Sequence, residues 1–143
     1  MPTVNDILKR KGNEVHTVAP SVTVLDATKL MNQHRIGALL VVQDGHVLGM
    51  FTERDVLTRI VAVSRDPVTT KVSEVMTTPV AYCTPESSLE ECGDIFTARH
   101  IRHLPVLSEN QLKGVITSGD VLAFETTTHQ RTINYLEAYI QGP

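Results

Sequence analysis

Residues 49–57 read GMFTERDVL and residues 114–122 read GVITSGDVL, so a glycine, a threonine, an aspartate and a Val-Leu pair recur at one spacing. The match is longer than this motif, because residues 15–57 align with residues 80–122 without a gap. Unrelated segments of that length would share about three identities at average residue frequencies. The identical pairs are Val15/Val80, Pro20/Pro85, Ile36/Ile101, Leu39/Leu104, Val41/Val106, Gly49/Gly114, Thr52/Thr117, Asp55/Asp120, Val56/Val121 and Leu57/Leu122. The chain therefore contains one structural unit twice.

Each copy has the pattern of a β-α-β-β-α unit: an extended segment, apolar residues at helical spacing, two apolar strands and a second helix. Asp44-Gly45 is a tight-turn signal between the paired strands of the first copy. In the first copy the segments fall at 15–18, 24–31, 38–42 and 47–52, with the second helix opening at Thr52. In the second copy they fall at 80–83, 89–99, 104–107 and 112–117, with the second helix opening at Thr117.

Similar lead-in segments precede both copies, VNDIL at 4–8 and VSEVM at 72–76. We therefore divide the chain into a first repeat with an N-terminal lead-in helix and a second repeat with a C-terminal helical tail, at 1–65 and 66–143. The tail is expected to continue through residues 132–140, with or without a break. A chain of 143 residues forms one ordinary domain or two small units with a shared core, in a mixed α/β (α+β) fold.

Composition excludes several functional classes. Hydrophobic residues make up 41% and charged residues 20% of a chain with net charge −3, and its longest basic cluster is Lys9-Arg10-Lys11, so nucleic-acid binding is not expected. The first residues lack the pattern of a signal peptide, and no apolar run approaches the ~18 residues that span a bilayer. The spacing of Cys83 and Cys92 does not suit zinc. We expect a cytoplasmic protein with two reduced, buried thiols and no metal.

The recurrent threonine and aspartate point to phosphate and ribose. Thr52 and Thr117 lie where a strand passes into a helix, and free backbone N–H groups there favour phosphate. Asp55 and Asp120, one helical turn later, can accept hydrogen bonds from ribose hydroxyls. The alternative is a helix capping box, which needs no ligand, and both roles can coexist.

The two motifs resemble the Gly-hydrophobic-hydrophobic-Thr/Ser-x-x-Asp signature of CBS (cystathionine β-synthase) domains. The segment IRHLPV at 101–106 resembles the one before the middle strand in IMP dehydrogenases and in the AMP-activated kinase γ subunit. The resemblance covers about residues 4–124 and is nearest to free-standing bacterial CBS pairs.

This resemblance implies a pseudo-twofold pair of repeats, called a Bateman module, with two clefts between them. Each cleft takes a threonine and an aspartate from one repeat and its purine pocket from the other. The ligands it implies are AMP, ADP, ATP, NAD or S-adenosylmethionine, with AMP favoured here. The expected residues of one cleft (cleft A) are Thr52, Arg54, Asp55, Val80, Tyr82, Arg102, His103 and Pro105. Those of the other (cleft B) are Thr117, Gly119, Asp120, Val15, Thr17, Gly37 and Ala38.

The two clefts are not expected to be equivalent. Arg54, Arg102 and His103 supply positive charge to cleft A, and an arginine fork matches phosphate oxygens. Cleft B has small residues at the positions of Arg102 and His103, so it should be roomier and less basic. We interpret Lys9-Arg10-Lys11 as a solvated helix end.

The sequence therefore predicts a non-catalytic nucleotide sensor that acts on an unknown effector protein. The alternatives are a ligand-free interaction adaptor and a small nucleotide-hydrolysing enzyme. No catalytic set of residues favours the enzyme.

A homodimer is expected, because each repeat has more apolar helical surface than its sheet covers. That surface consists of Leu30, Met31, Ile95, Phe96, Val56, Leu57, Val121 and Leu122.

Overall fold

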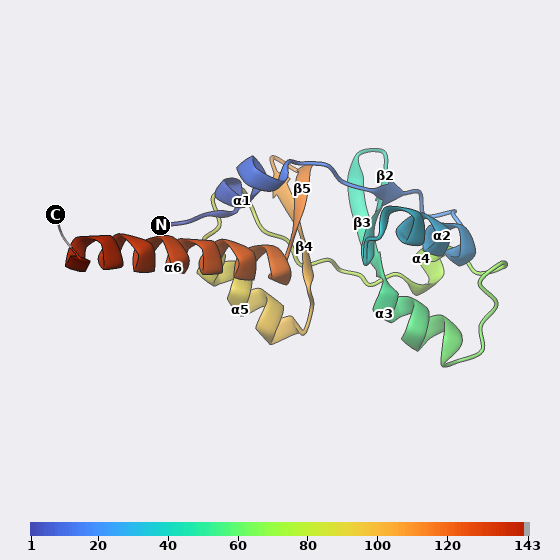
Figure 1. Cartoon of the computed structure of the whole chain (residues 1–143). Coiled ribbons are helices and arrows are strands. Elements are labelled where there is room, and N and C mark those ends of the chain that lie inside the picture. The colour runs from blue at the N-terminus through green and yellow to red at the C-terminus, as the bar shows by residue number, and fades with distance from the viewer. Residues whose placement is uncertain (142–143) are drawn as a thin grey trace.

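The computed structural model describes residues 1–141 and consists of two units that lie side by side (Figure 1). In the first unit, β1 pairs in parallel with β2, and β2 pairs antiparallel with β3. Helices α2, α3 and α4 complete that unit, as Figure 1 shows. The bounds are β1 Thr17–Val18, α2 Val24–His34, β2 Ala38–Gln43, β3 His46–Thr52, α3 Glu53–Val56 and α4 Val72–Val75.

The second unit repeats this arrangement around the antiparallel pair of β4 and β5. Its predicted first strand is reduced to a single parallel bridge between Cys83 and Val106. The remaining elements match the sequence prediction. Their bounds are α5 Leu89–Arg99, β4 His103–Ser108, β5 Gln111–Thr117 and α6 Ser118–Gln141.

The two hairpins share one geometry. Asp44 and Gly45 have φ of 52° and 79°, and Glu109 and Asn110 have φ of 53° and 62°. Two successive residues with positive φ match the right-handed twist of the strands they join. Each hairpin also shifts register at the same point of the repeat, after Val41 in the first and after Val106 in the second. The duplication is thus preserved in backbone detail.

The lead-in segments are exchanged between the units. Helix α1 (Val4–Lys11) places Val4 and Ile7 in the core of the second unit, whereas α4 places Val72 and Val75 in the core of the first. The two cores therefore do not divide at residue 65, where the sequence repeat divides. Residues 12–16 lead from α1 to β1, so the chain crosses between the units just after Lys11 (Figure 1).

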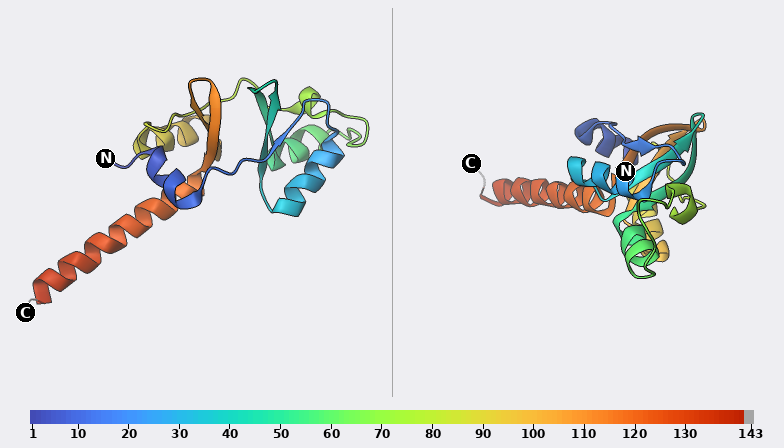
Figure 2. Two further views of the ribbon diagram at one scale, coloured as in Figure 1. Left: turned by 90° about the horizontal axis from the view of Figure 1, so that it is seen from above. Right: turned by 90° about the vertical axis from the view of Figure 1, so that its right-hand side faces the viewer.

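The helices after the two motifs differ. Helix α3 passes into a π-helical turn, η1 (Leu57–Val61), whereas α6 runs unbroken from Ser118 to Gln141 and projects beyond the second unit (Figure 2). Of the eight apolar residues expected to form a dimer surface, Met31, Phe96 and Val121 are buried within the chain, and Leu30, Val56 and Ile95 are partly buried. Leu57 and Leu122 stay 62% and 65% exposed. Across residues 1–141, every helix is too short or too polar to cross a bilayer.

Candidate functional site

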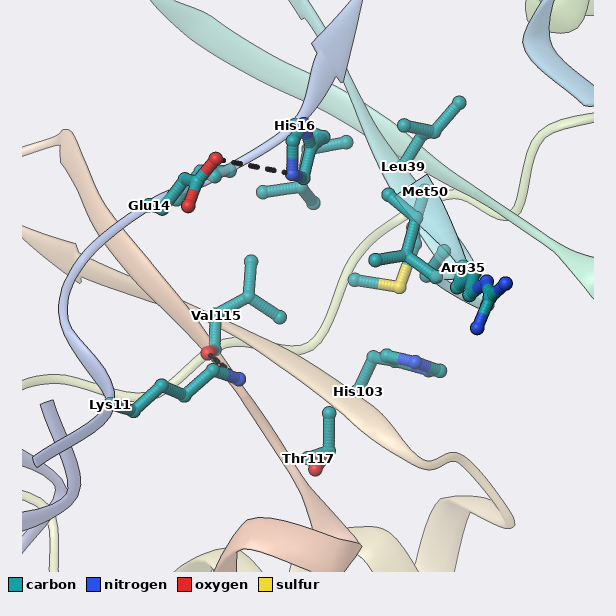
Figure 3. Close-up of a pocket in the computed structure, with 14 residues that line it drawn as sticks. Lys11, Glu14, His16, Arg35, Leu39, Met50, His103, Val115 and Thr117 are labelled. Atoms are coloured by element: carbon teal, nitrogen blue, oxygen red, sulfur yellow. Dashed lines mark hydrogen bonds and ion pairs between the residues drawn. The ribbon is translucent and has the colours of Figure 1, made fainter. Parts of the chain in front are cut away.

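A cavity of about 390 Å³ lies where the two units meet (Figure 3). The first unit contributes the residues between α2 and β2, the start of β2 and Met50 of β3, and the second unit contributes residues of β4 and β5. The segment that crosses between the units after α1 supplies another wall. The lining residues are Lys11, Glu14, Val15, His16, Arg35, Ile36, Gly37, Ala38, Leu39, Leu40, Met50, His103, Val115 and Thr117.

Thr117 brings the start of α6 to this cavity. The Thr117 backbone N–H donates to Asp120 Oδ2 at 2.9 Å, and the Asp120 N–H donates to Thr117 Oγ1 at 3.0 Å. This reciprocal pair is a capping box, as the alternative interpretation of the motif predicts. The Asp120 side chain is still 26% exposed, so it can also accept hydrogen bonds from a ligand.

Lys11 connects α1 to the same carboxylate. Its Nζ lies 2.7 Å from Asp120 Oδ2 and donates to the Val115 carbonyl oxygen at 2.9 Å. Figure 3 shows Lys11 on one side of the cavity and Arg35 on the other, with His103 between them. The Lys11 side chain is 36% exposed, so its charge is only partly solvated and is balanced locally by Asp120.

Three histidines contribute to the cavity or its margin. The rings of His16 and His34 stack with centroids 4.1 Å apart, and His16 Nε2 lies 3.5 Å from Glu14 Oε1. Burial lowers the pKa of His103 below its ordinary value, and the Lys11 ammonium acts in the same direction. A neutral His103 carries both a donor and an acceptor nitrogen, which suits the polar edge of a base.

The equivalent motif of the first unit is closed off. Asp55 forms the same capping box with Thr52, with hydrogen bonds of 3.0 and 3.2 Å. Its carboxylate also accepts from Thr77 Oγ1 at 3.1 Å and lies 3.6 Å from Arg59 Nε. The Asp55 side chain is 5% exposed. Its hydrogen-bonding capacity is used within the chain, so a ligand would have to displace Thr77 or Arg59.

The structure brings together part of each predicted residue set. Val15, Gly37, Ala38 and Thr117 of cleft B line the cavity. Asp120 stands directly behind Thr117, whereas Thr17 and Gly119 are exposed and do not line the cavity.

The residues of cleft A are more dispersed. His103 lines the cavity described above with the cleft B residues, because it pairs with Thr117 across the hairpin. Arg54 donates to the His100 carbonyl oxygen at 3.3 Å, which brings the Thr52 motif to the end of α5. Pro105 is fully buried and does not line this cavity. Thr52 and Val80 are half-buried and Arg102 and Tyr82 are exposed, and all four lie outside this cavity.

The structure adds contacts to two of the sequence interpretations about charge. The cavity that contains cleft B residues is also lined by Lys11 and Arg35, which the sequence interpretation did not assign to it. The cluster Lys9-Arg10-Lys11 is the exposed end of α1, as the sequence predicts. Two of its side chains also make contacts: the Arg10 guanidinium lies 4.5 Å from the ring centroid of Phe124, and Lys11 binds Asp120. Sequence reasoning missed these contacts because the exchange of the lead-in helices has no local signal.

Two other kinds of functional site are a metal centre and a reactive cysteine. Across residues 1–141, no three His, Cys, Asp or Glu side chains gather as metal ligands would. Cys83 and Cys92 are free and buried, as the sequence predicts. The hydrogen bond with Cys92, together with burial, raises the pKa of the Cys83 thiol, which makes it a poor nucleophile.

Comparisons with known proteins agree with this architecture. The CBS domain family model matches residues 4–62 and 72–126. The CBS domain-containing protein YhcV of Bacillus subtilis is 39% identical over 121 residues, which cover 85% of this chain and 84% of YhcV. A solved structure with CBS domains from Burkholderia ambifaria is 41% identical, with a TM-score of 0.81 over 84% of this chain and 90% of its own.

A second solved structure shares the fold at lower identity. It is a CBS domain pair in complex with 5′-methylthioadenosine and S-adenosyl-L-methionine, 21% identical to this chain. Its TM-score is 0.80 over 90% of this chain and 98% of its own.

Proposed function

This chain belongs to the CBS-domain family, and on that premise we propose that it is a non-catalytic regulatory module that binds an adenosine nucleotide between its units. The observation that carries the proposal is the cavity at the start of α6, lined by Thr117 with Asp120 directly behind it. Its volume of about 390 Å³ falls in the range of small-molecule sites.

The residue types around the cavity suit the parts of a nucleotide. Asp120 accepts hydrogen bonds from the ribose hydroxyls, as acidic residues do in dinucleotide-binding folds. The apolar side chains of Ile36, Leu39 and Met50 provide a surface for the flat face of a base. His103 then meets a polar edge of that base.

The ligand we favour is AMP, ahead of ADP, ATP, NAD and S-adenosylmethionine. The adenosine part is supported by the solved CBS pair of this fold, whose complex contains two adenosine compounds. The phosphate part is supported by Lys11 and Arg35, because cationic side chains in a partly desolvated cavity favour an anionic group.

Binding between the units gives a route to regulation. A ligand that contacts both units stabilises one relative arrangement of them, in proportion to its difference in affinity for the alternatives.

We further propose a homodimer that presents this arrangement to an effector protein. The exposed side chains of Leu57 and Leu122, at equivalent positions of the two repeats, are the surface for self-association.

The direct test is mass spectrometry of small molecules released from protein purified under native conditions, followed by thermal unfolding with each adenosine compound. A ligand at a hundredfold excess over its dissociation constant adds about 2.7 kcal/mol to the free energy of unfolding. Guanosine nucleotides, pyrimidine nucleotides and free bases serve as controls. The absence of any shift at millimolar adenosine ligand would favour the interaction adaptor, and conversion of the nucleotide to a product would favour the enzyme.

A further inference from the structure

Lys11 binds the same carboxylate that we propose for the ribose hydroxyls. Its Nζ lies 2.7 Å from Asp120 Oδ2, the same oxygen that accepts from the Thr117 N–H. A ribose hydroxyl that donates to Oδ2 competes with the Lys11 ammonium for the lone pairs of that oxygen. A ligand whose ribose hydroxyl takes Oδ2 therefore draws Lys11 away from Asp120 or shares this oxygen with it.

A displaced Lys11 needs a new partner. Its side chain is only 36% exposed, and the other fixed cation of the cavity, Arg35, offers it no compensation. Glu14 is the remaining carboxylate of the lining, but its side chain is 83% exposed and lies against His16. A phosphate on the ligand supplies the missing negative charge. A neutral nucleoside supplies none, and a sulfonium adds a further positive charge.

The side chain has the freedom to make this exchange. Lys11 is the last residue of α1, and it carries its charge on a flexible four-carbon stem. Its backbone is held in place nonetheless, because Val4 and Ile7 of the same helix are buried in the second core. The ammonium can therefore move between Asp120 and a ligand while the helix stays fixed.

We infer that Lys11 determines specificity in this cavity: it leaves Asp120 for the ligand's phosphate, and so favours anionic adenosine nucleotides over neutral or cationic adenosine compounds. This inference rests on the proposed function and adds a residue that the Thr-x-x-Asp motif does not contain. The position of the Lys11 side chain would then depend on whether the cavity holds a ligand. Lys11 lies where the two units meet, since α1 belongs to the second core and the chain crosses to the first unit just beyond it.

The test is calorimetric titration of wild-type, Lys11→Gln, Lys11→Arg and Lys9→Gln chains with AMP, adenosine and S-adenosylmethionine. Lys9→Gln is the matched control, because Lys9 lies on the same helix and does not line this cavity. We expect Lys11→Gln to weaken AMP binding by about tenfold or more, the size of a lost charge-assisted hydrogen bond. Adenosine affinity should stay constant or rise, because Asp120 loses a competitor. Lys11→Arg should keep the preference for AMP, and Lys9→Gln should match the wild type.

The outcomes separate this inference from the proposed function. If Lys11→Gln weakened AMP and adenosine by the same factor, Lys11 would have only a structural role and the inference would be wrong, while nucleotide binding would stand. If the wild-type chain bound none of the three compounds, the proposed function itself would fail. Raising the salt concentration provides a second readout, because it should reduce the AMP preference of the wild type more than that of Lys11→Gln.

Discussion

Asp55 and Asp120 occupy equivalent positions in the two repeats, yet their side chains are 5% and 26% exposed. Both carboxylates cap the helix that follows their strand, so the difference arises from what else they bind. Asp55 is enclosed by Thr77 and Arg59 of its own unit, whereas Asp120 meets Lys11 at the margin of a cavity. One duplicated motif has thus become a structural cap in one place and a candidate ligand contact in the other.

We predict that Asp120→Ala weakens binding of both AMP and adenosine. The substitution removes the acceptor of the ribose hydroxyls, which both compounds share, and a loss of about 1–3 kcal/mol is expected for these hydrogen bonds. Calorimetric titration measures both affinities. A variant that lost AMP affinity but kept that of adenosine would contradict the ribose role, because adenosine contains the same ribose.

We predict that Asp55→Ala acts mainly on stability. It removes the cap of α3 and leaves Thr77 Oγ1 and Arg59 without their carboxylate. A loss of about 1–3 kcal/mol in the free energy of unfolding is expected from the cap and the orphaned partners together. Urea unfolding of Asp55→Ala beside Asp120→Ala tests this. Equal stability losses in the two variants would show that burial does not distinguish the two carboxylates.

The two motif glycines should differ in their tolerance of a side chain. A Cβ on Gly49 would lie 2.5 Å from Met76 Sδ and 3.0 Å from the Thr77 carbonyl oxygen. A Cβ on Gly114 would lie 2.9 Å from Leu8 Cδ2, which is the end of a flexible side chain. We therefore predict that Gly49→Ala costs about 1–3 kcal/mol of stability, as overpacking does, and that Gly114→Ala costs less. Thermal unfolding of the two variants gives the comparison, and the reverse order would contradict the docking of the lead-ins.

The sequence was sufficient for the repeat and for most of its elements, because hydrophobic periodicity and turn signals act locally. The hairpin turn at Asp44-Gly45 and the helix start after Thr52 follow from such signals. The exchange of α1 and α4 between the cores does not follow from local signals, since packing alone decides which unit an amphipathic helix covers. The same applies to the first strand of the second copy, which pairs only through Cys83.

The candidate site was predictable in outline only. Thr117, Gly37 and Val15 follow from the duplicated frame together with the family resemblance, because homologous positions meet across a pseudo-twofold arrangement. Lys11 and Arg35 do not follow from it, since one depends on the exchanged helix and the other on the left-handed C-cap of α2. These side chains supply positive charge to the cavity, so this part of its chemistry was not predictable from the repeat.

Self-association should depend on the exposed leucines at equivalent positions. We predict a dimeric mass by light scattering at micromolar protein, and a shift toward monomer for Leu57→Glu and for Leu122→Glu. A buried interface strongly disfavours an unpaired carboxylate. Val68→Glu is the matched control, because Val68 is 57% exposed but lies in the segment between η1 and α4. A monomeric wild-type mass, or equal disruption by Val68→Glu, would count against this surface.

Acid should destabilise the folded chain partly through His103. Burial and the Lys11 ammonium, assisted by Arg102, hold the pKa of His103 below its ordinary value of 6.5, against the smaller opposing effects of Glu53 and Asp120. The unfolded chain therefore binds more protons than the folded chain below about pH 6.5, so the free energy of unfolding falls as the pH falls through that window.

We predict that His103→Gln shows a shallower loss of stability than the wild type between pH 7.5 and pH 5.5, because glutamine carries no proton to be excluded. Urea unfolding at both pH values gives the two slopes, and His129→Gln, on the exposed part of α6, is the matched control. Slopes that were equal for the wild type and His103→Gln would place the acid sensitivity elsewhere. The Lys11→Gln substitution should raise the pKa of His103, because it removes the ammonium that disfavours a protonated imidazole. The pH dependence of that variant should therefore also be shallower, which links His103 to Lys11 by a measurement that involves no ligand.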